Sequence, residues 1–203
     1  VYWTGGYDST YRLCELAIVE RKVVQPIYLL FNIDSKKKTD YWVRKNRTQE
    51  LSTMKNVLKL LHKSFPYTKE LIKSPIIIEK DIIDYNFDSK FQELNLWPKK
   101  RSTHQYLFLA KFAAHYKKFI DIGVLGIHQN STFVNFLNKY TYKDSSTYKL
   151  SVQSDHPLYY LQFPLFSSTK RDLCMKARIH KFDHILAITW SCWFPKEGKV
   201  CGK

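Results

Sequence analysis

Hydrophobic and polar residues at the start of the chain follow the pattern of a strand–helix–strand unit. The apolar opening, Val1 to Trp3, predicts a strand, and a glycine-containing turn at residues 4–10 follows it. Apolar residues then recur at helical spacing at Leu13, Cys14, Ala17 and Ile18. The apolar run at residues 27–33 predicts a second strand. Together these patterns predict a βαβ unit.

The same alternation continues through the rest of the chain. Apolar residues have helical spacing at Leu51, Met54, Leu58 and Leu61, and again at Tyr106, Leu109, Ala110, Ala113 and Tyr116. Residues 76–78 are a third strand candidate, and residues 119–125 have the pattern of a buried strand. Strands that alternate with helices predict an α/β fold that is Rossmann-like, with a parallel sheet covered by helices on both faces.

Two further segments complete the prediction of the fold. Residues 129–161 are polar and rich in Ser, Tyr and Asn, so we expect a loop or lid over a site. Thr169 and Asp172 form a capping signature for a helix that runs through about Ile179. No internal repeat and no linker interrupts the pattern, so residues 1–203 are predicted to form a single domain.

Composition narrows the class of protein and of partner. A chain of 203 residues with 44% hydrophobic and 16% aromatic content has the character of a globular domain, which excludes a disordered tail or a repeat array. The 33 basic and 18 acidic residues give a net charge of +15. That charge favours an anionic partner: a nucleotide, a nucleic acid, a phosphorylated metabolite or an acidic membrane surface. We interpret the basic stretch from Lys36 to Lys59 as a solvated face rather than an RNA track.

Apolar runs, cysteines and the two ends of the sequence indicate where the protein is located and how much of it this chain represents. No apolar run approaches the ~20 residues of a membrane span, and no secretory hydrophobic region opens the chain. Four cysteines are too few for a disulfide-built scaffold, which predicts a reducing compartment, the cytoplasm. The chain opens at Val1 instead of Met and closes at Lys203 just after a Cys-Gly pair, so we expect both ends to be truncated.

The glycine turn is the strongest candidate for chemistry. Backbone N–H groups of such a turn, together with the start of the following helix, form an anion site suited to phosphate. Its spacing is neither that of the Walker loop nor that of the dinucleotide-binding G-x-G-x-x-G. It resembles the Ser-Gly-Gly-x-Asp-Ser/Thr signature of the PP-loop ATP pyrophosphatases. The resemblance implies an ATP site formed by Trp3, Thr4, Gly5, Gly6, Tyr7, Asp8, Ser9, Thr10 and Phe31.

A second segment points to one family within that group. Thr189-Trp190-Ser191-Cys192 and Cys201-Gly202 resemble the C-terminal Thr-x-Ser-Cys and Cys-Gly-x-Cys-x-x-Cys stretch of the 7-cyano-7-deazaguanine synthases of the queuosine pathway. Weaker similarities occur in the same order between the two ends, at Leu30–Asn32, Gln49-Glu50, Pro98–Arg101, Phe119–His128, Pro164-Leu165 and Thr169-Lys170. The resemblance therefore spans essentially the whole chain.

The resemblance implies an activity and roles for individual residues. Members of that family are ATP-dependent carbon–nitrogen ligases, which adenylate an acid, release pyrophosphate and add ammonia to give an amide and then a nitrile on 7-deazaguanine. Asp8 would organise Mg²⁺ or the turn, and Arg101 and Lys170 would be cationic clamps on the phosphates. Cys192 and Cys201, in a C-terminal segment from about residue 189, would supply two of four thiolates to a structural Zn²⁺, the others lying beyond Lys203.

Departures from the family leave the substrate and the class of enzyme open. The family has an Asp and a Tyr-Pro-Asp-Cys-Arg run where this chain has Gln129-Asn130-Ser131-Thr132-Phe133. The leading acid is 7-carboxy-7-deazaguanine, with a related deazapurine or a macromolecular amine acceptor next. The alternative is a PP-loop tRNA-modifying enzyme, a thiolase or a lysidine-type ligase, for which the +15 charge would be the RNA footprint. A third class is a repurposed binding protein. We expect no membrane partner, and a homodimer is compatible with each class.

Overall fold

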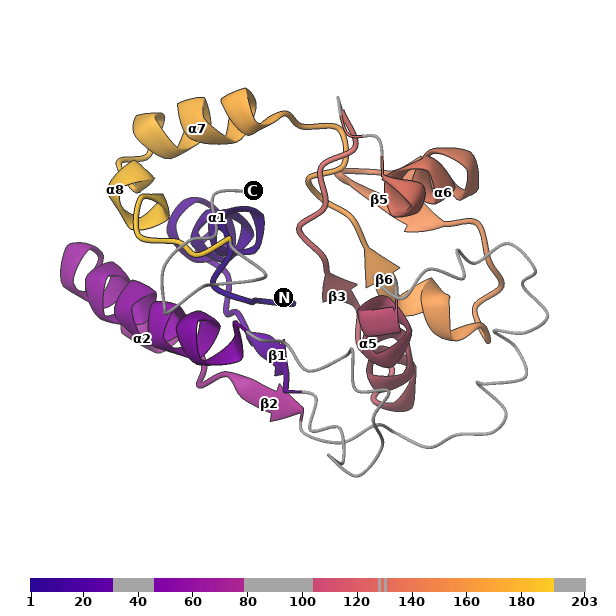
Figure 1. The fold of residues 1–203 in the computed structure, drawn as a ribbon, viewed down its shortest axis with the longest axis horizontal. Helices are drawn as coiled ribbons and strands as arrows, with labels where there is room; N and C mark the ends of the chain where they lie inside the picture. The colour runs from indigo at the N-terminus through magenta and orange to yellow at the C-terminus, as the bar shows by residue number, and fades with distance from the viewer. Residues whose placement is uncertain (31–45, 79–103, 128, 130, 192–203) are drawn as a thin grey trace. The chain divides into compact units, whose positions relative to one another are not determined.

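The chain is a mixed α/β protein, which confirms the predicted fold class in its coarser form. The computed structural model describes residues 1–30, 46–78, 104–127, 129 and 131–191 (Figure 1). The chain divides into two compact units, residues 1–80 with 174–203 and residues 81–173. The prediction of a single domain over residues 1–203 stays a prediction.

A parallel ladder forms the centre of the first unit. Tyr2 makes a parallel bridge to Ile27, and strand β1 (Ile27–Leu29) pairs in parallel with strand β2 (Ile76–Ile78). Between Tyr2 and β1 the chain forms helix α1 (Tyr7–Cys14), which continues as the π-helical segment η1 (Glu15–Val19). The predicted βαβ unit is thus confirmed, although the end of the second predicted strand lies outside the described residues.

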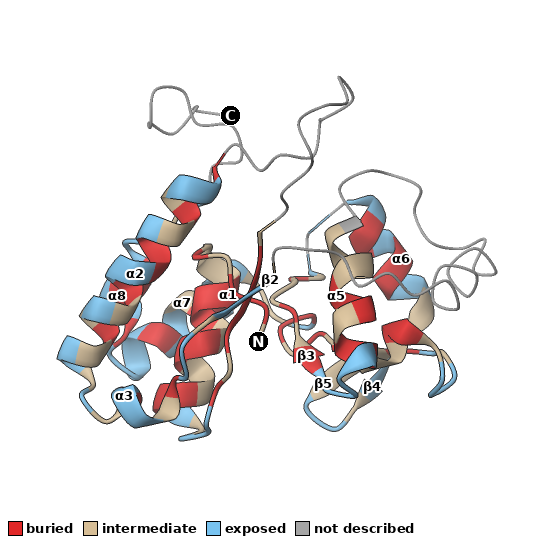
Figure 2. Cartoon of the chain, turned by 90° about the horizontal axis from the view of Figure 1, so that it is seen from below, coloured by how far each residue is buried: buried red, intermediate tan, exposed pale blue. Residues whose placement is uncertain are grey.

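The helix predicted from the stripe Leu51, Met54, Leu58 and Leu61 buries one face, on which Met54 and Leu61 lie, whereas Leu51 and Leu58 are only half-buried. Helix α2 (Arg47–Ser64) buries Met54, Val57 and Leu61, and its other side is exposed (Figure 2). Two short helices, α3 (Thr68–Leu71) and α8 (Asp183–Leu186), complete this unit together with most of α7 (Lys170–Ile179). A helical spacing of apolar residues therefore predicts part of the buried face, because three- and four-residue steps return to the same side.

The second unit has a four-stranded mixed sheet in the order β3-β6-β5-β4. Its strands are β3 (Ile120–Asp121), β4 (Thr141–Asp144), β5 (Thr147–Leu150) and β6 (Leu161–Gln162). The pair β3–β6 is parallel, and the pairs β6–β5 and β5–β4 are antiparallel. Its helices are α5 (His104–His115), α6 (Thr132–Tyr140) and the 3-10 segment η3 (Pro157–Tyr160).

Residues 129–161 are not the loop that their polar composition predicts, while their role as a lid over a site stays a prediction. They form α6, the β4–β5 hairpin and η3. Ser131 begins α6 because its hydroxyl accepts a hydrogen bond from the backbone N–H of Val134 at 3.1 Å. The helix then buries Phe133, Val134, Phe136 and Leu137. The segment is polar on average, but its apolar residues have the spacing of an amphipathic helix. The prediction of a loop, which used the average composition, is therefore wrong.

No described helix has the length and the apolarity needed to cross a bilayer. The finding covers the described parts of the chain only, and it agrees with the absence of a long apolar run in the sequence.

The start of α7 confirms the predicted capping signature. The hydroxyl of Thr169 accepts from the backbone N–H of Asp172 at 3.1 Å, and the carboxylate of Asp172 accepts from the backbone N–H of Thr169 at 2.8 Å. Two N–H groups that the helix itself leaves without acceptors are satisfied in this way.

We therefore expect Asp172→Ala to lower the free energy of unfolding by about 1 kcal/mol, because the reciprocal cap is lost. Asp172→Asn is the matched control, since its amide oxygen still accepts from Thr169, and it should cost less. The measurement is urea unfolding followed by circular dichroism. Equal stability of Asp172→Ala and the wild type would contradict the role of the cap.

Candidate functional site

The glycine turn lies between the bridge at Tyr2 and the start of α1. Gly5 has a φ of +72°, in the left-handed region that favours glycine. Gly6 is the N-cap of α1 and has φ −76° and ψ 162°, which any residue adopts. The backbone conformation therefore favours glycine at Gly5 and sets no such requirement at Gly6. A larger residue at Gly6 would be disfavoured only if its Cβ atom clashed with neighbouring atoms.

Helix α2 supports the turn from one side. A Cβ atom on Gly5 would lie 3.1 Å from the backbone oxygen of Glu50 and 3.3 Å from side-chain atoms of Thr53 and Met54. A Cβ atom on Gly6 would lie 3.3 Å from the Thr4 hydroxyl and 3.5 Å from the backbone oxygen of Trp190. Gly5 thus permits close packing of the turn on a helix backbone, whereas Gly6 faces atoms that a small shift can accommodate.

Hydroxyl groups within the predicted ATP-binding segment close the turn. The Ser9 hydroxyl donates to the backbone oxygen of Gly6 at 3.2 Å and accepts from the backbone N–H of Thr4 at 3.3 Å. The Thr10 hydroxyl accepts from the indole N–H of Trp3 at 3.0 Å, and both side chains are fully buried. Ser9 therefore fixes the shape of the turn directly, while Trp3 and Thr10 support it from the core.

The first turn of α1 carries Tyr7 and Asp8, two residues of the predicted site. Burial raises the pKa of the Tyr7 hydroxyl, and Cys174 and the nearby Asp8 carboxylate raise it further, so Tyr7 is neutral at physiological pH. The N–H groups at a helix start lack acceptors within the helix and attract anions. Asp8 adds a carboxylate there, a ligand type that Mg²⁺ prefers, so the donor set fits a magnesium-bound polyphosphate.

The C-terminal segment contacts the turn. The backbone N–H of Trp190 donates to the backbone oxygen of Gly5 at 3.0 Å. The Thr189 hydroxyl donates to the backbone oxygen of Leu186 at 2.7 Å, which holds this segment at the end of α8. The two segments that resemble PP-loop motifs, at opposite ends of the sequence, are therefore neighbours in the first unit.

A buried carboxylate behind the turn was missed as a site residue by the sequence reasoning. Glu50 is 4% exposed and accepts from the Tyr28 hydroxyl at 2.7 Å and from the Asn46 amide at 3.1 Å. Its backbone oxygen is also the atom nearest to Gly5. The signal was present, because Glu50 occupies the same helical stripe as the buried Met54 and Val57. A carboxylate on an apolar stripe indicates a specific polar network.

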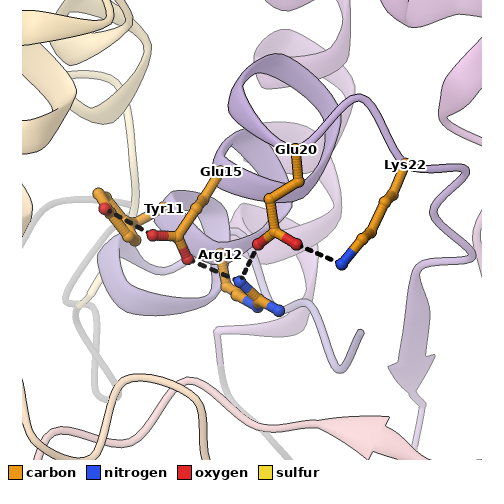
Figure 3. Close-up of polar contacts among 5 residues, drawn as sticks. All are labelled: Tyr11, Arg12, Glu15, Glu20 and Lys22. Atoms are coloured by element: carbon orange, nitrogen blue, oxygen red, sulfur yellow. Dashed lines mark hydrogen bonds and ion pairs between the residues drawn. The ribbon is translucent and has the colours of Figure 1, made fainter. Parts of the chain in front are cut away.

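Ion pairs hold α1 beyond its first turn (Figure 3). The Arg12 guanidinium lies 2.7 Å from the carboxylates of both Glu15 and Glu20, and the Lys22 ammonium lies 2.6 Å from Glu20. The Tyr11 hydroxyl donates to Glu15 at 3.0 Å. These interactions connect the last turn of α1 with η1 and with the residues that follow it. They stabilise the helical segment at the end opposite to the glycine turn.

Several predicted site residues lie outside the described residues: Phe31, Arg101, Cys192 and Cys201. Lys170 is the first residue of α7 and belongs to the second unit, where its side chain is exposed. Among the described residues no group of three or more His, Cys, Asp or Glu side chains has an arrangement suited to a metal ion. The cationic clamps and the zinc site stay predictions.

Cys14 and Cys174 lie on predicted helical faces, which predicts that both are core residues. Cys14 is fully buried, and burial raises the pKa of its thiol. Cys174 is only half-buried and contacts Tyr7. The expectation is confirmed for Cys14 and is wrong for Cys174, because α7 places Cys174 beside the start of α1 and leaves it partly exposed.

The geometry of the turn predicts different outcomes for its two glycines. Gly5→Ala should lower the free energy of unfolding by ~1–3 kcal/mol, since the new Cβ meets the α2 backbone and alanine disfavours positive φ. Gly6→Ala should change it by less than about 1 kcal/mol, because the backbone conformation is allowed and only Thr4 must shift. Chemical denaturation of both variants measures the difference. Equal destabilisation would contradict the assignment of distinct roles.

The ion pairs predict a pH dependence of stability. Burial acts to raise the pKa of Glu20, but hydrogen bonds from Lys22 and Arg12 outweigh it and hold that pKa below its usual value. The stabilisation is therefore present above the pKa of the unfolded chain and is lost as the pH falls through the lower pKa of the folded chain. Glu20→Gln should cost ~1 kcal/mol or less at pH 7, and the difference from wild type should shrink toward pH 3.

Urea unfolding at several pH values measures this effect, with Glu70→Gln on α3 as the control. Glu70 is exposed, so its variant should show no comparable loss at neutral pH. A difference between Glu20→Gln and wild type that grows toward acid would contradict the sign of the effect.

Comparison with models of known protein families, with curated proteins and with solved structures finds no match to this chain. The turn and its neighbours must therefore be interpreted from their own geometry and from the motifs that they contain.

Proposed function

We propose that the chain binds ATP at residues 4–10 and adenylates a carboxylate, with release of pyrophosphate. A nitrogen nucleophile then attacks the acyl-adenylate to form a carbon–nitrogen bond. One observation carries the proposal: Gly5 turns the chain in the left-handed conformation between the bridge at Tyr2 and α1, against the backbone of Trp190. This arrangement joins the two motifs that resemble those of the 7-cyano-7-deazaguanine synthases.

The local geometry supports specific roles in that reaction. Negative charge develops on the leaving pyrophosphate, and the N–H groups at the start of α1 are oriented to stabilise it. Gly6 has no side chain to separate a phosphate from these groups. Asp8 would hold Mg²⁺, which when bound supplies charge neutralisation for the phosphates. Ser9 keeps the turn in shape, and neutral Tyr7 adds no negative charge beside it.

A Rossmann-like fold is part of the same proposal. The parallel register of β1 with β2 and that of β3 with β6 support it. So does the crossover from Tyr2 through α1 to β1, because parallel neighbours need a connection of this kind. The zinc site at Cys192 and Cys201, and the clamps at Arg101 and Lys170, belong to the proposal by resemblance.

The proposed acid is 7-carboxy-7-deazaguanine, with ammonia as the nucleophile. The net charge of +15 favours the second candidate, a PP-loop enzyme that modifies tRNA, because such an enzyme must hold a polyanion. The two candidates share the ATP site and differ in the acceptor, so one assay can separate them.

The assay measures pyrophosphate released from ATP with Mg²⁺, with the acid and ammonia, and with tRNA in a parallel reaction. Asp8→Asn should reduce release at least ~100-fold, because the amide keeps the shape of the side chain and removes the charge that Mg²⁺ requires. The matched control is Asp183→Asn, which changes an exposed aspartate in the first turn of α8. It should retain the wild-type rate.

The outcomes separate the hypotheses. Release that depends on the acid, with amide or nitrile detected by mass spectrometry, supports the synthase-like reaction. Release that requires tRNA supports the tRNA-modifying enzyme. No release under either condition, or full activity of Asp8→Asn, would overturn the assignment of the ATP site.

A further inference from the structure

The sheet of the second unit has two faces of different character. On one face Ile120, Leu161 and Leu150 are buried to within 1% exposure and form part of the core. The neighbouring row contains Asp121, Gln162, Lys149 and Tyr142, which pair across adjacent strands in that order. Because successive residues of a strand point to opposite faces, this second row lies on the face away from the core.

Aromatic side chains gather on the outer face. Phe119 precedes Asp121 by two positions, so it points to the same side, and it is 44% exposed. Its ring centroid lies 5.5 Å from that of Tyr159 and 5.4 Å from that of Tyr160. On the edge strand β4, Tyr142 is 46% exposed. Two large aromatic side chains on one face, each nearly half in solvent, mark a candidate interaction surface.

Lys149 connects these aromatic residues. Its ammonium lies 4.7 Å from the ring centroid of Phe119 and 2.7 Å from the Asp144 carboxylate. The hydrogen bond to Asp144 raises the pKa of Lys149, with further contributions from Tyr142 and Tyr159. Lys149 is therefore charged and close to both tyrosines, which places the members of the outer face near one another. We call Phe119, Tyr142, Tyr159, Tyr160 and Lys149 the aromatic–lysine face.

The surroundings of this face are basic. Lys117 and Lys118 immediately precede Phe119 in the chain, and both are exposed. Lys143 pairs with Tyr148 on β5 and so lies on the opposite face of the sheet, outside these surroundings. Among the described residues neither Lys117 nor Lys118 has an ion-pair partner, and the Asp144 carboxylate is paired with Lys149. Asp121 adds one further carboxylate to this face, so its charges sum to a positive value. The local charge is therefore positive, in keeping with the +15 of the whole chain.

We propose that the aromatic–lysine face binds single-stranded nucleic acid, with bases stacked on Phe119 and Tyr142 and phosphates held by the surrounding lysines. Exposed aromatic rings with interspersed cations on an open sheet face suit this ligand, because every base has a flat face and every nucleotide carries a charge. An acidic peptide would satisfy the lysines but not the rings. The inference goes beyond the proposed function and does not depend on the ATP site.

The test is fluorescence anisotropy of a labelled oligouridine of about 12 nucleotides with the full 203-residue chain, at about 50 and 200 mM salt. Wild type should bind, and more weakly at the higher salt. Phe119→Ala and Tyr142→Ala should each weaken binding about 5- to 100-fold, the range for loss of one stacked base. Phe119→Trp should retain binding, because it keeps a stacking plane. Circular dichroism checks that each variant is folded. If Phe119→Ala does not fold, Tyr142→Ala still tests the contribution of an aromatic side chain on this face.

A charge-reversal pair tests the lysines against a matched control. Lys117→Glu/Lys118→Glu should weaken binding and reduce the dependence of the logarithm of the affinity on the logarithm of the salt concentration, by about 0.7 for each phosphate that is no longer neutralised. Lys55→Glu/Lys59→Glu makes the same change of charge on exposed residues of α2 and should have a smaller effect. Oligothymidine in place of oligouridine reports whether the 2′-hydroxyl contributes.

The outcomes decide the proposal. Loss of affinity in both aromatic variants, with retention in Phe119→Trp, supports stacking on this face, whichever sugar binds better. Absence of binding by wild type at the lower salt concentration would overturn it. So would unchanged affinity in the aromatic variants, or equal competition by polyglutamate of matched charge, since either would indicate attraction by charge alone.

Discussion

The packing of Gly5 against the backbone of α2 is the constraint on which the rest of the first unit depends. A Cβ atom at Gly5 would lie 3.1 Å from the Glu50 oxygen, so any other residue would push the turn and the helix apart and would also have to adopt positive φ. The next residue, Gly6, is the N-cap of α1, and the Ser9 hydroxyl donates to its backbone oxygen. The position of Gly5 against α2 therefore fixes the place where α1 begins. The hydrogen bond from Trp190 then fixes the C-terminal segment on the same turn.

Buried polar groups around the turn make this arrangement specific. The Glu50 carboxylate accepts from Tyr28 on β1, and the Glu50 backbone oxygen faces Gly5, so one residue of α2 contacts both the strand and the turn. The Asn46 amide also donates to Glu50, and a shift of Glu50 would leave these buried donors unsatisfied, which favours a single arrangement. The ion pairs of Arg12 hold the other end of the same helical segment. A site that holds phosphate through backbone groups needs this rigidity, because the amides cannot adjust as side chains do.

The second unit uses a sheet with two faces of different chemistry. One face forms the core with residues such as Leu161, and α5 packs against β6. The other presents Phe119, Tyr142 and Lys149. The proposed ATP site uses residues of the first unit, and the proposed nucleic-acid surface uses residues of the second. The proposed ATP site and the proposed nucleic-acid surface are therefore separable by mutation.

The sequence by itself determined the βαβ start, the cap of α7 and the place of the glycine turn, because each depends on spacing or on neighbours along the chain. It determined the buried face of α2 only in part, since Met54 and Leu61 are buried but Leu51 and Leu58 are half-buried. It failed for residues 129–161, where polar composition outweighed a short amphipathic pattern. Only the tertiary structure decided that Gly5 and not Gly6 needs positive φ, that Glu50 is a buried partner of Tyr28, and that Trp190 meets the turn. These facts arise from contacts between residues far apart in the chain, which local propensity does not encode.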